Sequence, residues 1–282
     1  MSALARYLAT SRPATPDNIS RQRLILCMQP LAAVWLLTAM LSACNADENG
    51  QKLLQSATKA FDRDDFTQAA ELATRAAAAS LDDAGIQQRA GEVLFLSGQA
   101  EASLPCFDRA NKLDRPNAPH NWQRGVALGC AGKFEAGAEQ FRLHHEVNPN
   151  DVENSAWYFL CLAKSKGKAA AAAAIIPSQG DRRQPMMAVL KMLQGTLKPE
   201  EVLAAAEANT TEGPERKMAM FYGFLYVGLY QDSIGESEKA VSALEKSIAV
   251  AEKDYMGRTA KIYRDLRFPK SPPSSEPSAP SK

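Results

Sequence analysis

The chain has 282 residues, of which 45% are hydrophobic and 23% charged, and its formal net charge is +1. A charge this close to zero gives no electrostatic case for nucleic-acid binding, so we expect no nucleic acid among its partners. Its five cysteines include no CxxC pair, so neither a disulfide framework nor a zinc site is predicted, and we expect no metal and no cofactor. The length suits one large domain or an array of repeats.

The N-terminal region contains an apolar segment that ends in small residues and a cysteine. Its uninterrupted part, residues 31–41, would span about 16 Å as a helix, half of a bilayer core, which suits a signal sequence better than a membrane span. The sequence Leu41-Ser42-Ala43-Cys44 completes this segment and resembles the lipobox of bacterial lipoproteins. The resemblance implies a signal peptide over residues 1–43, palmitate and other acyl chains on Cys44, and a short tether over residues 44–49.

A longer version of the same segment leaves an alternative open. Counted from Leu24, the apolar run continues to Ala43 with only Gln29 and Pro30 interrupting it, which is long enough for an uncleaved transmembrane helix. Four arginines and one aspartate precede the run, so the positive-inside rule places the rest of the chain outside the cytoplasm in both cases. We therefore expect a membrane protein of the bacterial cell envelope that faces the periplasm. Asn45 favours the outer membrane by resemblance to Gram-negative lipoproteins, in which aspartate at this place is the usual retention signal for the inner membrane.

From residue 50 onward the sequence repeats with a period of 34 residues. Windows 50–83, 84–117 and 118–151 carry small residues at their eighth and twentieth positions, and the second and third carry phenylalanine at the twenty-fourth. This pattern resembles the tetratricopeptide repeat (TPR), in which small residues lie where two antiparallel helices touch and a large residue fills the space beside them. The small residues are Ala57, Gly91 and Gly125 at the eighth position and Ala69, Ser103 and Gly137 at the twentieth, and the phenylalanines are Phe107 and Phe141.

The repeat continues with less regular spacing to residue 268. Alanine-rich segments with few β-branched residues favour helix throughout, so we predict an all-α fold over residues 50–268. It is a TPR-type solenoid of about five helical hairpins, one of them degenerate, with a C-terminal closing helix. The units predicted after the first three windows are hairpins over 153–186, 187–220 (degenerate, with helices over Met186 to Leu193 and from Pro199) and 221–254, the closing helix over 255–268, and a disordered tail rich in proline and serine over 269–282.

Repeat position also predicts which side chains face a ligand. In TPR proteins the first helix of each pair lines a concave groove. The candidate groove residues at the corresponding positions are Glu92, Phe95, Trp122, Val126, Trp157 and Lys164. Trp122 and Trp157 occupy equivalent places in successive repeats, and aromatic side chains on a groove are typical binding anchors. The alternative stays open that both pack in the core, because the core tryptophan of the TPR pattern lies one residue earlier.

The sequence contains no motif that indicates catalysis: no GxSxG, no phosphate-binding glycine loop and no HExxH. His144 and His145 are adjacent, so on a helix they point about 100° apart and do not readily share a metal ion. A cysteine nucleophile would require Cys130 or Cys161 beside a histidine, whereas we expect both to be small buried side chains. We therefore predict that the protein is not an enzyme.

Three features follow one another along the chain. The lipobox precedes the hairpins, Arg124–Leu128 is followed by Pro149-Asn150-Asp151, and Tyr226-Val227-Gly228 leads to Gly235. This arrangement resembles that of the NlpI-type TPR lipoproteins of the bacterial envelope, which implies an adaptor that holds envelope proteases or cell-wall enzymes together. The tail and the first hairpin depart from the family pattern, so the same partners are not implied.

These features lead to the hypothesis of a membrane-anchored adaptor. Its groove would bind a peptide or helix of another envelope protein, and the lipidated Cys44 would hold the complex at the membrane. The alternative is a self-associating scaffold, a homo-oligomer in which terminal hairpins stack between chains, anchored by an uncleaved N-terminal helix.

Overall fold

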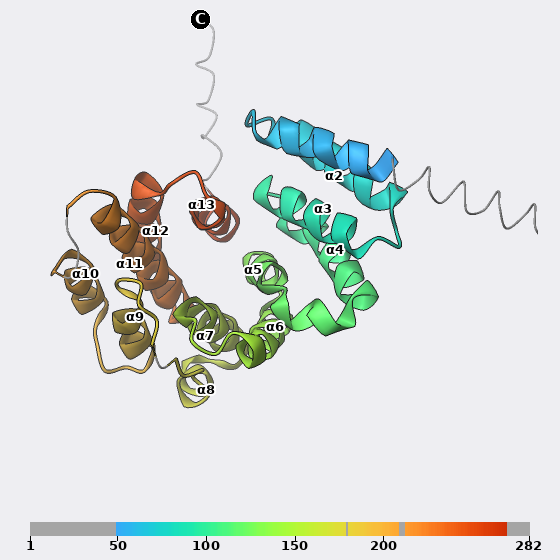
Figure 1. Ribbon diagram of the computed structural model, residues 1–282. Helices are drawn as coiled ribbons and strands as arrows, with labels where there is room; N and C mark the ends of the chain where they lie inside the picture. Colours follow the sequence, from blue (N-terminus) through green and yellow to red (C-terminus); the bar gives the residue numbers. More distant parts are fainter. Residues whose placement is uncertain (1–48, 179, 209–211, 270–282) are drawn as a thin grey trace, which may run out of the picture. The chain divides into compact units, whose positions relative to one another are not determined.

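The computed structural model of the protein describes residues 49–178, 180–208 and 212–269 (Figure 1). The predicted signal peptide, Cys44 and the tail from residue 270 onward lie outside the described residues, so those assignments stay predictions. Within the described ranges, no helix combines the length and the apolar character that a membrane span requires.

All regular structure in the described residues is helical, and the helices pair as hairpins (Figure 1). The first hairpin joins a helix over residues 49–61 to α2 (Phe66–Ala79). The following elements are α3 (Ala84–Leu96), α4 (Ala100–Leu113), the 3₁₀ helix η1 (Arg115–His120), α5 (Trp122–Cys130), α6 (Phe134–Val147), α7 (Val152–Lys166), α8 (Lys168–Ala173), α9 (Met186–Leu193), α10 (Pro199–Ala208), α11 (Pro214–Ser233), α12 (Ser237–Val250) and α13 (Tyr255–Arg267). From α2 to α8 each α-helix packs against the next, which confirms the predicted all-α, TPR-type stack of hairpins.

The hairpins begin and turn at residues whose chemistry suits those places. Asp83 accepts a hydrogen bond from the backbone N–H of Ile86 and so caps α3, and Asn121 caps α5 through Arg124 in the same way. The α5–α6 turn requires a left-handed backbone at Gly132, whose φ is 72°. The sequence therefore stops each helix where the next must reverse direction.

Small residues let the paired helices approach closely. A Cβ atom on Gly125 would lie only 2.8 Å from Cζ of Phe141, and one on Gly228 would lie 2.9 Å from Cγ of Leu244. In each pair the glycine stands at the eighth position of a repeat and the large side chain at the twenty-fourth. The large side chain fills the space that a side chain on the glycine would otherwise occupy.

Two stretches differ from the predicted units. In the hairpin predicted over 153–186, α8 ends at Ala173, and the described residues between 174 and 185 contain no helix, because Pro177 and Pro185 cannot continue one. The predicted division between residues 220 and 221 lies inside α11, which begins at Pro214. Proline is favoured in the first turn of a helix, and no further proline interrupts α11 before Ser233.

Replacing Gly125 by alanine tests the close contact. Overpacking against Phe141 outweighs the gain of about 1 kcal/mol that alanine has over glycine in a helix, so we expect urea titrations to show a free energy of unfolding lower by about 1–2 kcal/mol. Gly180→Ala is the control, because a Cβ there would meet no atom within 4 Å. Equal stability of the two variants would contradict a tight contact at Gly125.

Candidate functional site

The closing helix α13 lies against the first helices of earlier hairpins, and it packs on α3, α5 and α12 (Figure 1). Tyr255 stacks on Phe95 with ring centroids 5.8 Å apart and meets Trp122 edge-to-face at 4.9 Å. Tyr263 meets Trp157 edge-to-face at 5.8 Å. We call the side of α3, α5 and α7 that carries these aromatic residues the inner face.

The predicted groove residues lie on or near the inner face, but α13 covers much of it. The buried ones are Phe95, Val126 and Trp157, each at most 1% exposed, and the partly exposed ones are Glu92, Trp122 and Lys164. Of the two alternatives left open for the tryptophans, Trp157 takes the core position, whereas Trp122 stays partly exposed. The chain's own last helix packs on this face. The sequence of α13 predicted a closing helix but not which surface it would cover.

A buried carboxylate ties α13 to the hairpins. Asp232 of α11, 2% exposed, accepts hydrogen bonds from Lys164 Nζ of α7 at 2.6 Å and from the hydroxyl of Tyr263 of α13. Nearer the other end of α13, the guanidinium of Arg258 lies 3.7 Å from the ring centroid of Phe66. Lys164, predicted to face a ligand, therefore serves as a partner of Asp232.

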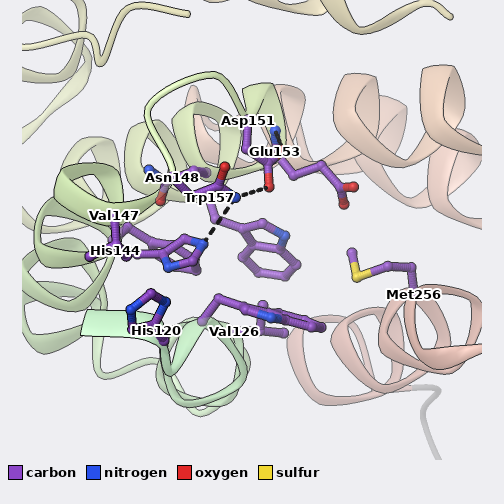
Figure 2. A pocket seen from close by; sticks show the side chains of 12 residues that line it. His120, Val126, His144, Val147, Asn148, Asp151, Glu153, Trp157 and Met256 are labelled. Carbon is purple, nitrogen blue, oxygen red and sulfur yellow. Dashed lines mark hydrogen bonds between the residues drawn. The ribbon is translucent and has the colours of Figure 1, made fainter. Parts of the chain in front are cut away.

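A cavity of about 570 Å³ stays open at the inner face, beside α13 (Figure 2). We call it the inner cavity. Its apolar wall consists of Trp122, Val126, Phe141, Trp157 and Met256. Its polar wall includes His120, His144, Asp151, Glu153 and Asn154, so residues from η1, α5, α6, α7 and α13 meet around it.

His144 is held in the polar wall by its neighbours. Its Nδ1 lies 3.0 Å from the carbonyl oxygen of Pro119, and its Nε2 lies 3.4 Å from Nδ2 of Asn148. The carbonyl can only accept, so Nδ1 carries the proton and Nε2 is the acceptor. Burial lowers the pKa of His144 below its ordinary value, which favours the neutral ring.

The carboxylates of the polar wall share one guanidinium. Arg183 forms ion pairs with Asp151, Glu153 and Asp181, at 2.6 Å for the two aspartates. The hydroxyl of Tyr226 donates a further hydrogen bond to Glu153. Burial raises the pKa of Glu153, and the nearby charge of Asp151 adds to this rise, in spite of the opposing effects of Arg183 and Tyr226.

Two buried side chains at the cavity have unused polar atoms. Asn154 is 3% exposed, and neither its Oδ1 nor its Nδ2 has a hydrogen-bond partner among the described residues; the same holds for Nε1 of Trp157. Sequence reasoning missed Asn154 because a polar residue near the start of a helix is usually solvated. One feature of the sequence could have indicated that Asn154 is buried: it lies about one helical turn before the buried Trp157, so both side chains project from the same face of α7.

The two cysteines considered as nucleophiles are buried. Burial raises the pKa of both Cys130 and Cys161, so their thiols stay protonated and unreactive. Within the part of the chain that the structure describes, no group of three or more His, Cys, Asp or Glu side chains is placed to hold a metal ion.

The described hairpins, with their paired small and large residues, define a tetratricopeptide-like helical-repeat protein. No protein-family model matches the chain. Its similar solved structures include the TPR domain of P58(IPK), at 14% identity over 78% of this chain and 66% of that one, with a TM-score of 0.35. Naa15/Naa10 bound to HypK-THB matches at 15% identity over 79% of this chain and 37% of that one, with a TM-score of 0.34. The chain thus spans less than two thirds of the length of either of these structures. Because both TM-scores are low, the fold assignment rests on the hairpins of this chain and not on the similarity.

Substitution of Lys164 tests how far it stabilises the buried Asp232, the carboxylate to which Tyr263 of α13 binds. We expect Lys164→Met to lower the free energy of unfolding by about 2 kcal/mol, because it leaves the buried Asp232 with one partner fewer. In Lys164→Met/Asp232→Asn the amide still accepts from Tyr263 but carries no charge, so about half of the loss should be recovered. Wild-type stability in the single variant would show that Lys164 does not stabilise the buried carboxylate to which Tyr263 of α13 binds.

The lowered pKa of His144 predicts a pH dependence. Below the ordinary histidine pKa of about 6.5, the unfolded chain binds this proton more readily than the folded one, so stability rises with pH in that window. We expect the thermal midpoint to fall as the pH decreases from about 7 to about 5, and His144→Gln to remove part of the fall. The raised pKa of Glu153 acts in the opposite sense, so the difference between the two profiles isolates His144. Identical profiles would contradict the assignment.

Proposed function

We propose that this protein is an adaptor of the bacterial cell envelope that binds other proteins and is held at the membrane by lipid on Cys44. The observation that carries the binding role is the stack of TPR-like hairpins with a cavity left open at its inner face. Helical-repeat stacks use such continuous faces to bind other proteins. An enzyme is less well supported, because the described cysteines are buried and protonated.

The membrane role rests on the sequence. The apolar segment and the lipobox-like Leu41-Ser42-Ala43-Cys44 precede the hairpins directly. One acyl chain binds a membrane only marginally, whereas two or more give stable anchoring, so the several acyl chains of a bacterial lipoprotein would keep the complex in place. By resemblance to NlpI-type lipoproteins, its partners would be envelope proteases or cell-wall enzymes, and the outer membrane is the favoured location.

A Cys44→Ser variant tests the anchor. In cells labelled with a palmitate analogue, the wild type should carry label and sediment with membranes, and the variant should lose the label and leave the membrane fraction. A variant that stays in the membrane without label would instead indicate the uncleaved N-terminal helix. A variant that keeps the label would refute lipid attachment at Cys44.

Crosslinking tests the adaptor role separately. The full chain is crosslinked in intact cells, extracted in detergent and isolated, and we expect envelope proteases or cell-wall enzymes among the crosslinked products. Light scattering of the purified chain at several concentrations gives the matched control for self-association. Products that contain only further copies of this chain, with a mass that rises with concentration, would favour the self-associating scaffold.

A further inference from the structure

The inner cavity keeps buried hydrogen-bonding atoms that the fold does not use. A buried polar group without a partner lowers the stability of the folded state. Asn154 has both a free acceptor and a free donor, and Trp157 adds a free N–H, all in side chains at most 3% exposed. Their requirements match a ligand that has N–H donors and carbonyl acceptors close together.

The charges around the cavity select the sign of that ligand. The ionisable side chains among the described residues that line it are two histidines and two carboxylates, with no lysine or arginine. Arg183, which is not among those residues, divides its charge between Asp151, Glu153 and Asp181. A cation would therefore relieve an excess of negative charge, whereas a carboxylate or phosphate would add to it.

The apolar wall selects the body of the ligand. Lysine and arginine carry an apolar stem below a charged tip, and tryptophan faces attract such cations. Trp122 lines the cavity and is partly exposed. Val126 and Met256 belong to the same apolar wall (Figure 2). About 570 Å³ lies within the usual range for a cavity that binds a small ligand.

We propose that the inner cavity binds a lysine or arginine residue in an extended peptide of a partner protein. The cationic tip lies against Asp151 and Glu153 and donates to Oδ1 of Asn154. Nδ2 of Asn154 and Nε1 of Trp157 donate to carbonyl oxygens of the peptide. This assignment rests on the proposed adaptor function and specifies the partner segment it recognises.

Peptide binding to the purified full chain in detergent tests the proposal. The probes are acetyl-Ala-Ala-Xaa-Ala-Ala-amide peptides with arginine, lysine, glutamine or glutamate at Xaa. Saturation-transfer NMR measures the binding of each peptide to the protein. We expect the arginine and lysine peptides to bind at least about tenfold more tightly than the glutamine peptide, equivalent to about 1.4 kcal/mol, and to weaken as salt increases. The glutamate peptide should show no transfer. Equal binding of all four peptides, or no binding of any, would overturn the proposal.

Asn154→Leu separates a binding role from a structural one. Because Asn154 has no partner to lose, this substitution should leave the thermal midpoint unchanged or raise it, while binding of the arginine peptide falls at least about tenfold. Asn117→Leu, at an exposed asparagine outside the cavity, is the matched control and should bind like the wild type. A lowered thermal midpoint with unchanged binding would mean that Asn154 only supports the fold.

Two further results keep the test decisive. If Asn154→Leu does not fold, Asn154→Ala removes the same polar atoms without adding volume, and retained preference for arginine would refute the site. Crosslinked envelope partners combined with no peptide binding would overturn the cavity assignment and leave the adaptor function standing. Peptide binding without crosslinked envelope partners would support the cavity assignment and overturn the proposed adaptor function in the envelope.

Discussion

The close approach of paired helices is the constraint on which the rest of this structure depends. Gly125 leaves room for the ring of Phe141, and Gly228 leaves room for Leu244, so the same small–large contact recurs in hairpins that are far apart in the sequence. The first helices α3, α5 and α7 carry the aromatic residues of the inner face. Without that regularity, α13 would have no continuous surface on which to pack.

The position of α13 changes what the inner face can do. Tyr255 and Tyr263 use the aromatic residues that would otherwise anchor a foreign ligand, and Asp232 binds the helix through a buried hydrogen bond. These aromatic pairs stabilise the fold in two ways. Burial of the rings contributes through the hydrophobic effect, and each pair adds about 0.5–1.5 kcal/mol beyond the area it buries. Beside α13, the inner cavity remains as a space that a ligand could enter.

The inner cavity combines features that are costly for a protein to keep without a use. Its carboxylates outnumber the guanidinium that neutralises them, and Asn154 is buried with its hydrogen bonds unmade. Burial lowers the pKa of His144 beside them, which favours its uncharged ring. The cavity thus offers hydrogen-bonding groups and negative charge, which agrees with the proposed adaptor function.

The sequence by itself determined the helical fold, the first hairpins and the small–large contacts, because a repeat of 34 residues encodes spacing between near neighbours. It did not determine the end of α8 or the start of α11. Even the degenerate hairpin was predictable: α9 covers Met186–Leu193 and α10 begins at Pro199, as the composition indicated. Only the tertiary structure decided where α13 packs and which polar groups meet. Glu153 contacts Arg183 and Tyr226 from positions 30 and 73 residues away, and no local pattern records such contacts. The isolation of Asn154 has the same cause, since the lack of a hydrogen-bond partner depends on every surface packed around a side chain.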